Sequence, residues 1–153
     1  MRPRLENLLP AARGVGLALV IIAGLLPRPA AAEPLLPLEL NRLEQVNAPA
    51  EACRLWLVLA NDAAGAAPIA SLRLDLVAFG RDGLIARRVA VELGPLGAGR
   101  TGVRFFDLPG LPCEELSRLL INNVLACRIG GEDLPNCAER LRVTSRAGLR
   151  FGL

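Results

Sequence analysis

Residues 69–93 read IASLRLDLVAFGRDGLIARRVAVEL, and this stretch decides the fold class. Its first half alternates leucine with charged residues at 72–76 (LRLDL). Successive side chains of a β-strand point to opposite faces, so this pattern predicts a strand with one buried face. Residues 80–83 (GRDG) are typical of a tight hairpin turn, after which residues 84–93 return as a second strand. The faces expected to be buried carry Leu72, Leu74, Leu76 and Ala78 on the first strand and Ile85, Val89, Val91 and Leu93 on the second.

Aliphatic runs of similar length recur along the rest of the chain, separated by turn-forming residues. One segment is ambiguous. Residues 113–117 (CEELS) suit a single turn of helix, and residues 118–127 (RLLINNVLAC) continue either as a helix or as a strand. The β-branched Ile121 and Val124 favour the strand. The runs expected to form strands are 38–46, 53–61, 69–79, 84–93, 103–108 and 138–146, with 118–127 as a further candidate.

This spacing of short strands predicts an all-β domain over residues 38–153. The expected fold is an Ig-like antiparallel β-sandwich of about seven strands, with one short helical turn at most. A partly open barrel is the alternative.

The N-terminus has the pattern of a secretory signal. A start with three arginines is followed by an uncharged apolar run at residues 15–26 (VGLALVIIAGLL) and by alanines at 30–32. We therefore expect a cleavable signal peptide at residues 1–32 and a tether at 33–37 (EPLLP). The run is shorter than the ~20 residues that cross a bilayer, and an uncleaved signal-anchor is the alternative. No pair of adjacent arginines precedes the run, which favours general secretion over twin-arginine export.

The charge of the chain gives no indication of an acidic or nucleic-acid partner. Of 18 basic and 15 acidic residues, four basic and one acidic residue lie in the signal, so the remainder is electrically balanced. The net charge of +3 therefore belongs to the segment expected to be removed.

The four cysteines, Cys53, Cys113, Cys127 and Cys137, all lie after the signal, and an even number in an exported chain predicts two disulfides. Antiparallel strands place Cys53 and Cys113 at one end of the sandwich, and Cys127 and Cys137 at the other. Strands of about nine residues hold the two ends roughly 30 Å apart, whereas bridged Cα atoms lie within about 7 Å. The expected pairing is therefore Cys53–Cys113 with Cys127–Cys137, and a helix at 113–127 would leave it unchanged. A zinc site of four thiolates is the alternative, although no C-x-x-C pair occurs.

Four segments carry a resemblance: CRLWLVLAN, LDLVAFGRDGLIARR, FFDLPGLPC and LLINNVLAC. Their succession of aliphatic strands and turns is similar to that of small bacterial Ig-like extracellular domains. More narrowly, they resemble a group of small exported alphaproteobacterial proteins of unknown function, often labelled Tat pathway signal or hypothetical proteins. The resemblance covers most of residues 38–146. It implies a sandwich fold and an envelope location, and it brings no activity and no site residues.

The residue types exclude several catalytic schemes. The chain has no histidine, so a Ser-His-Asp triad cannot form, and it has no lysine, which excludes a Ser-Lys dyad. The conspicuous acids occur in no pattern that forces two carboxylates together, and we expect no enzymatic activity, cofactor or metal. We expect Asp82 to be a turn residue and Glu114 and Glu115 to begin a short helical turn. The acids considered are Asp75, Asp82, Asp107, Glu114 and Glu115.

Two features are candidate binding surfaces. The expected last strand aligns Arg140, Arg142 and Arg146 on one face, either for an acidic partner or as a solvated edge that prevents aggregation. Trp56 lies on the opposite face of its strand from Leu55, Leu57 and Leu59. It is expected either to be covered as part of the interior or to serve as a binding anchor.

The expectation for function is a non-enzymatic periplasmic binding or accessory module of the bacterial envelope, whose partner is another envelope protein. It would act by strand addition at a sheet edge or through the surfaces of Trp56 and the arginines. The alternative is a structural envelope component held at the inner membrane by an uncleaved signal-anchor. Contact with a membrane is expected only in that second case, and no contact with nucleic acid is expected.

Overall fold

A computed structural model describes residues 35–153, and the predicted signal peptide lies outside the described residues. Within residues 35–153, no helix is long and apolar enough to span a membrane.

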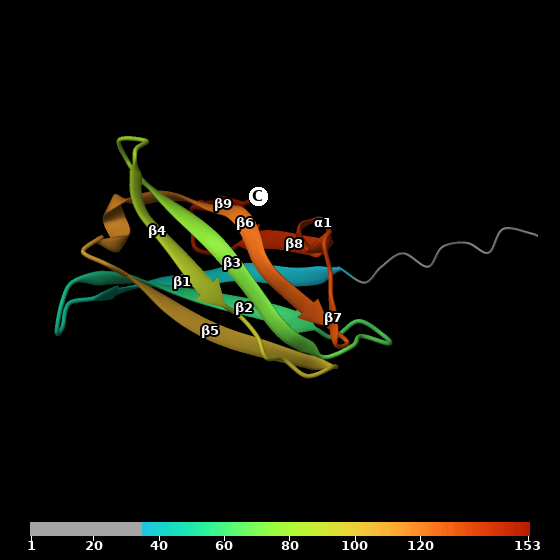
Figure 1. Ribbon diagram of the computed structural model, residues 1–153. Helices are drawn as coiled ribbons and strands as arrows, with labels where there is room; N and C mark the ends of the chain where they lie inside the picture. Colours follow the sequence, from blue (N-terminus) through green and yellow to red (C-terminus); the bar gives the residue numbers. More distant parts are fainter. Residues whose placement is uncertain (1–34) are drawn as a thin grey trace, which may run out of the picture. The chain divides into compact units, whose positions relative to one another are not determined.

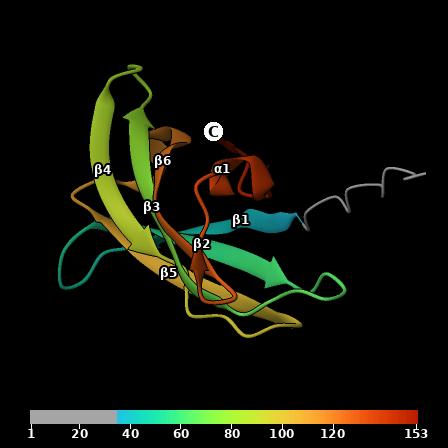
Figure 2. The same ribbon diagram turned by 45° about the vertical axis from the view of Figure 1, so that its right-hand side comes forward.

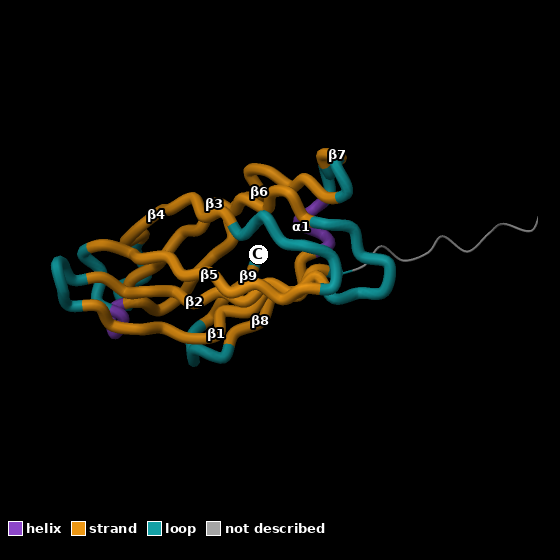
Figure 3. Tube along the Cα trace, turned by 90° about the horizontal axis from the view of Figure 1, so that it is seen from below, coloured by secondary structure: helices purple, strands orange, loops and turns teal. Residues whose placement is uncertain are grey.

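The described part is a sandwich of two β-sheets (Figure 1, Figure 3). The first sheet has the order β5-β2-β1-β8, and the second has the order β4-β3-β6-β7, with β9 also pairing with β6. The strands of the first sheet are β1 (Leu36–Val46), β2 (Ala52–Asn61), β5 (Arg100–Pro109) and β8 (Leu141–Ser145). Those of the second are β3 (Ile69–Gly80), β4 (Ile85–Glu92), β6 (Leu116–Ile129), β7 (Glu132–Asp133) and β9 (Arg150–Gly152).

Six of the strands follow the order of an Ig-like sandwich, whereas β8 pairs with β1 in the first sheet and not with β6. Strands β1, β2 and β5 take the places of strands A, B and E, and β4, β3 and β6 take those of C′, C and F. The hairpin of β3 and β4 extends beyond the rest of the sandwich (Figure 2), and Leu84 and Ile85 are exposed at its end. Residues 35–153 form nine strands because two short ones, β7 and β9, occur in addition to the expected set.

The core lies between the two sheets and consists mainly of leucine. Leu55, Leu57 and Leu59 of β2 face Leu72, Leu74 and Leu76 of β3, and each of them is at most 2 % exposed. Burying a leucine stabilises the folded chain by about 1.5–3 kcal/mol, so these alternating residues hold the sheets together. The expected inward face of β3 is therefore confirmed.

Both disulfides form as expected: Cys53 is bonded to Cys113 and Cys127 is bonded to Cys137. The first joins the start of β2 to η1 (Cys113–Glu115), a single turn of 3₁₀ helix before β6. The second joins the end of β6 to the short turn α1 (Cys137–Arg140). The ambiguous segment is a short turn followed by the long strand β6.

Three expectations of detail are wrong. The last strand begins at Leu141 rather than at 138, because Cys137 is bonded to the second sheet while β8 pairs with β1 in the first. Residues 137–140 form the helical turn in that crossing. Strand β1 begins at Leu36, inside the expected tether. Ile85 is 65 % exposed, since the pairing of β3 with β4 shifts register between Ala78 and Phe79.

Candidate binding surface

The outer face of the first sheet gathers aromatic and charged side chains from three neighbouring strands. Trp56 of β2 lies between Arg42 of β1 and Phe105 of β5, each directly opposite it in the sheet. Arg54 lies in the same way between Glu44 and Asp107. We call this set the aromatic face: Arg42, Glu44, Arg54, Trp56, Val58, Val103, Phe105 and Asp107.

An irregularity in β1 creates one side of this face. Leu38 and Leu40 point into the core, and simple alternation would turn Arg42 inward as well. The pairing with β2 shifts register between Leu40 and Arg42, so Asn41 is an extra residue and the side chain of Arg42 points outward. Glu44 follows on the same side. The alternation of charged and apolar residues in the sequence did not indicate this bulge.

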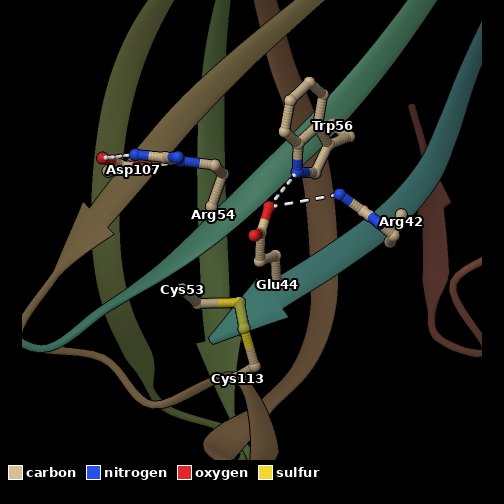
Figure 4. Close-up of polar contacts among 7 residues, drawn as sticks. All are labelled: Arg42, Glu44, Cys53, Arg54, Trp56, Asp107 and Cys113. Atoms are coloured by element: carbon tan, nitrogen blue, oxygen red, sulfur yellow. Dashed lines mark hydrogen bonds and ion pairs between the residues drawn. A yellow bond between two sulfur atoms is a disulfide. The ribbon is translucent and has the colours of Figure 1, made fainter. Parts of the chain in front are cut away.

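Trp56 is held from two sides. Its indole Nε1 donates a hydrogen bond of 2.7 Å to Glu44, which also accepts a bond of 3.3 Å from Arg42 (Figure 4). The guanidinium carbon of Arg42 lies 5.2 Å from the centroid of the indole ring, close enough for a cation–π contact. The Trp56 and Phe105 ring centroids are 5.3 Å apart, with their planes tilted by 45°. These contacts fix the orientation of the only tryptophan in the chain.

Phe105 is positioned by an ion pair beside it. Arg54 donates two hydrogen bonds to Asp107, of 2.7 and 3.0 Å (Figure 4). This pairing holds the guanidinium carbon of Arg54 4.3 Å from the Phe105 ring centroid. The hydrogen bonds from Arg54 lower the pKa of Asp107 below its usual value. Asp107 is therefore ionised, and the planar guanidinium stays in place over the ring.

The apolar part of the face is open to solvent. Phe105 is 51 % exposed and Val103 is 52 % exposed, while Trp56 is half-buried. Beside them is a shallow hollow of about 390 Å³ lined by Asn41, Arg42, Trp56, Val58 and Val103. Trp56 is thus on the outer surface and not part of the interior, so the anchor interpretation fits its position.

The predicted arginine cluster is only partly assembled. Arg142 points outward from β8, and Arg146 follows the strand and donates a 2.8 Å hydrogen bond to Glu39 of β1. Hydrogen bonds from Asn41 and from Arg146 lower the pKa of Glu39. Arg140 ends the α1 turn and lines a different hollow, so the expected row of three arginines on one strand is wrong.

Sequence reasoning missed four members of the aromatic face: Arg42, Glu44, Val103 and Phe105. Two signals were present. Val103, Phe105 and Asp107 alternate in the expected fifth strand, and Arg54 lies two residues before Trp56 on the same face of its strand. Combining these two signals requires knowing that the two strands are neighbours in the sheet.

The acids considered as catalytic candidates lie in separate places. Asp82 accepts a hydrogen bond from the backbone N–H of Leu84, which makes it a turn residue as expected, and Glu114 and Glu115 belong to η1. Asp107 is paired with Arg54 on the first sheet, and Asp75 lies on β3 in the second. Among residues 35–153, no group of three or more acidic or cysteine side chains has a geometry that would hold a metal ion.

Asp75 is a buried carboxylate on the outer side of the second sheet. Its side chain is 5 % exposed and accepts two hydrogen bonds from Arg88, of 2.8 and 2.9 Å, and a third of 2.7 Å from Asn122. The bonds from Arg88 and then Asn122 lower its pKa. Both carboxylate oxygens are thus engaged, and the group joins β4, β3 and β6.

This arrangement predicts a specific acid sensitivity. Because the pKa of Asp75 is lower in the folded than in the unfolded chain, its carboxylate stabilises the fold above the usual aspartate range. That stabilisation disappears as the pH falls through the folded-state value. We expect Asp75→Asn to lower the free energy of unfolding by about 1–2 kcal/mol at neutral pH and to flatten its decline in acid.

Urea unfolding of the wild type and Asp75→Asn at a series of pH values measures this. Asp62→Asn, which removes an exposed acid from the loop after β2, is the control and should follow the wild type. An Asp75→Asn protein with the same pH dependence as the wild type would show that this carboxylate does not contribute.

Comparisons of the chain with protein-family models, with curated proteins and with solved structures find no match.

Proposed function

We propose that the chain is a non-enzymatic binding or accessory module of the bacterial envelope, exported to the periplasm, which binds another envelope protein through its aromatic face. The observation that carries the proposal is the exposed pair of Phe105 and Val103 beside the fixed Trp56. Tryptophan and arginine are enriched among the residues that dominate binding energy, and aromatic side chains are enriched at interface cores.

The charges of the face suit a protein partner. Each carboxylate on the aromatic face is bonded to an arginine, so docking of an apolar group would bury no unpaired acid. The side chains that lie over the rings of Trp56 and Phe105 are arginines, whose planar guanidinium groups lose little freedom when covered. Holding the rings before binding reduces the entropic cost of association.

The disulfides support an exported location. Two disulfides indicate an oxidising, extracellular-type environment, since cytosolic thiols are kept reduced. The periplasm is the proposed compartment because the N-terminal residues have the pattern of a bacterial secretory signal.

Strand addition, the other expected mode of binding, is less well supported. At the free edges of β4 and β5, Arg87 and Arg104 donate hydrogen bonds to backbone carbonyls that an added strand would need. The proposal therefore places binding on the sheet face and not on these edges.

The test is co-purification from cells that export the tagged protein, comparing the wild type with Phe105→Ala. We expect one envelope protein to be retained by the wild type and at least about tenfold less of it by the variant, as for removal of a central anchor. The matched control is Leu125→Ala, which removes a side chain of similar exposure, 47 %, from β6 of the other sheet. Equal retention by Phe105→Ala and the wild type would contradict the proposal.

The intact mass of the purified protein separates the two envelope roles. A chain that begins at Glu33 with both disulfides formed agrees with a released periplasmic module. A chain that retains residues 1–32 agrees instead with a component anchored at the inner membrane.

A further inference from the structure

Strands β4 and β5 are the outermost strands of their sheets and lie on the same side of the sandwich. An outermost strand has backbone N–H and C=O groups without a neighbouring strand, and these groups are a template for pairing with another chain. Natural sheets block such edges with charged side chains, turns or covering segments. This side of the sandwich is therefore where self-association would have to be prevented.

The groups of β5 that face outward follow from its pairing with β2. The N–H of Gly110 donates to the carbonyl of Glu51, and this bond sets the alternation along the ladder. Because hydrogen-bonded pairs alternate with non-hydrogen-bonded pairs along an antiparallel ladder, every second pair is hydrogen-bonded, and Leu55 with Phe106 is one of them. The backbone groups that point away from β2 are then those of Thr101, Val103, Phe105, Asp107 and Pro109.

Two arginines occupy carbonyls in this outward set. Arg104 donates a 3.1 Å hydrogen bond to the carbonyl of Val103 and a 3.3 Å bond to that of Pro95, in the connection between β4 and β5. Arg87 donates a 2.7 Å bond to the carbonyl of Pro109 and another of 2.7 Å to that of Ala86 on β4. Arg87 thus joins the edge of β5 to β4, and Arg104 joins it to the connection between β4 and β5.

The occupied carbonyls are those that a second copy of β5 would use. Identical strands pair antiparallel about a two-fold axis, and an axis at Phe105 places Val103 opposite the partner's Asp107. The carbonyl of Val103 would then accept from the N–H of the partner's Asp107, and the carbonyl of Pro109 from that of the partner's Thr101. Arg104 and Arg87 already donate to these two carbonyls and place their guanidinium groups beside them, while Pro109 has no N–H to donate.

We infer that Arg87 and Arg104 close this edge, and that without them β5 pairs with β5 of a second copy of the chain. The joined sheets would be continuous, because both copies present the same unpaired groups at Phe105 and Asp107. The arginines therefore keep the chain monomeric and its aromatic face separate from that of a neighbouring molecule.

The test compares the wild type with Arg87→Met/Arg104→Met, purified after export with its own leader. Methionine keeps an apolar stem of similar length and removes all donors. The matched control is Arg73→Met/Arg142→Met, which changes the charge equally at exposed positions on β3 and β8. Mass is measured by light scattering over a concentration series, and amide exchange of Phe105 is measured at both ends of the series.

We expect the wild type and the control to keep the mass of one chain throughout. The mass of Arg87→Met/Arg104→Met should rise toward twice that value with concentration, and its Phe105 amide should exchange more slowly in the dimer. If this double variant does not fold, Arg104→Met alone decides in the same way, since it frees the carbonyl of Val103. A folded variant that stays monomeric, or a wild type that is already paired through β5, would overturn the inference.

Discussion

Replacing Cys53 and Cys113 together by alanine is expected to lower the free energy of unfolding by about 4 kcal/mol, the largest effect of any change considered. The disulfide closes a loop with a sequence separation of 60, and a closed loop of that length removes much of the entropy of the unfolded chain. A domain of this size is stable by only about 5–15 kcal/mol, so this one bond is a large share of the total.

Urea unfolding under non-reducing conditions measures the effect, and Cys127→Ala/Cys137→Ala is the comparison. That pair is separated by only 10 residues, and the expected loss is about 3 kcal/mol. Cys53, Cys127 and Cys137 are buried and Cys113 is partly buried against the core, so both pairs lose packing and the difference reports mainly loop length. A larger loss from the short loop than from the long one would contradict this account of stability.

Leu57→Ala is expected to lower the free energy of unfolding by about 3 kcal/mol, the largest effect of any single substitution considered. Leu57 is fully buried in the middle of β2, and truncating it leaves a cavity between the sheets. Its neighbour Val58 points the other way, to the half-exposed outer face, so Val58→Ala should cost well under about 1 kcal/mol.

The free energies of unfolding of these two variants test the assignment of the two faces of β2 directly. The residues are adjacent and both are aliphatic, and Leu→Ala removes only one carbon more than Val→Ala, so the contrast depends mainly on their direction. Similar losses from both variants would mean that the outer face is covered, and the aromatic face would then be unavailable for binding.

The fold follows from the sequence where the alternation of residues is regular. LRLDL at 72–76 and the runs of leucine in β2 predict the buried faces correctly, because a period of two fixes the face once the strand is known. The disulfide pairing follows for the same reason, since strand lengths separate the two ends of the sandwich.

Prediction from the sequence is wrong where the alternation of buried and exposed residues is broken, or where a tertiary contact overrides the local pattern. The bulge at Asn41 reverses the direction of Arg42 and Glu44, and the register shift near Phe79 exposes Ile85. Residues 137–140 have a strand-like context, but the bond of Cys137 to β6 requires a crossing between sheets there. Tertiary pairing decides these positions, and a single sequence does not contain that pairing in its local pattern.

The candidate site was predicted only through Trp56. Its position opposite three leucines was visible, whereas the contacts that define the face come from β1 and β5, which are distant in sequence. Phe105 is separated from Trp56 by 49 positions, yet it lies directly across from it. Sheet order is what brings the two rings together.

Site-specific photo-cross-linking tests the central claim, that the aromatic face is the binding surface, most directly. A photoreactive phenylalanine analogue is placed at position 105, or at position 125 on the other sheet, in the protein exported by its own cells. The chain has no lysine, so this approach avoids reagents that depend on lysine amines. We predict a discrete cross-linked product with one envelope protein from position 105 and none from position 125. Cross-linking from position 125 alone, or the absence of any product from position 105, would contradict the claim.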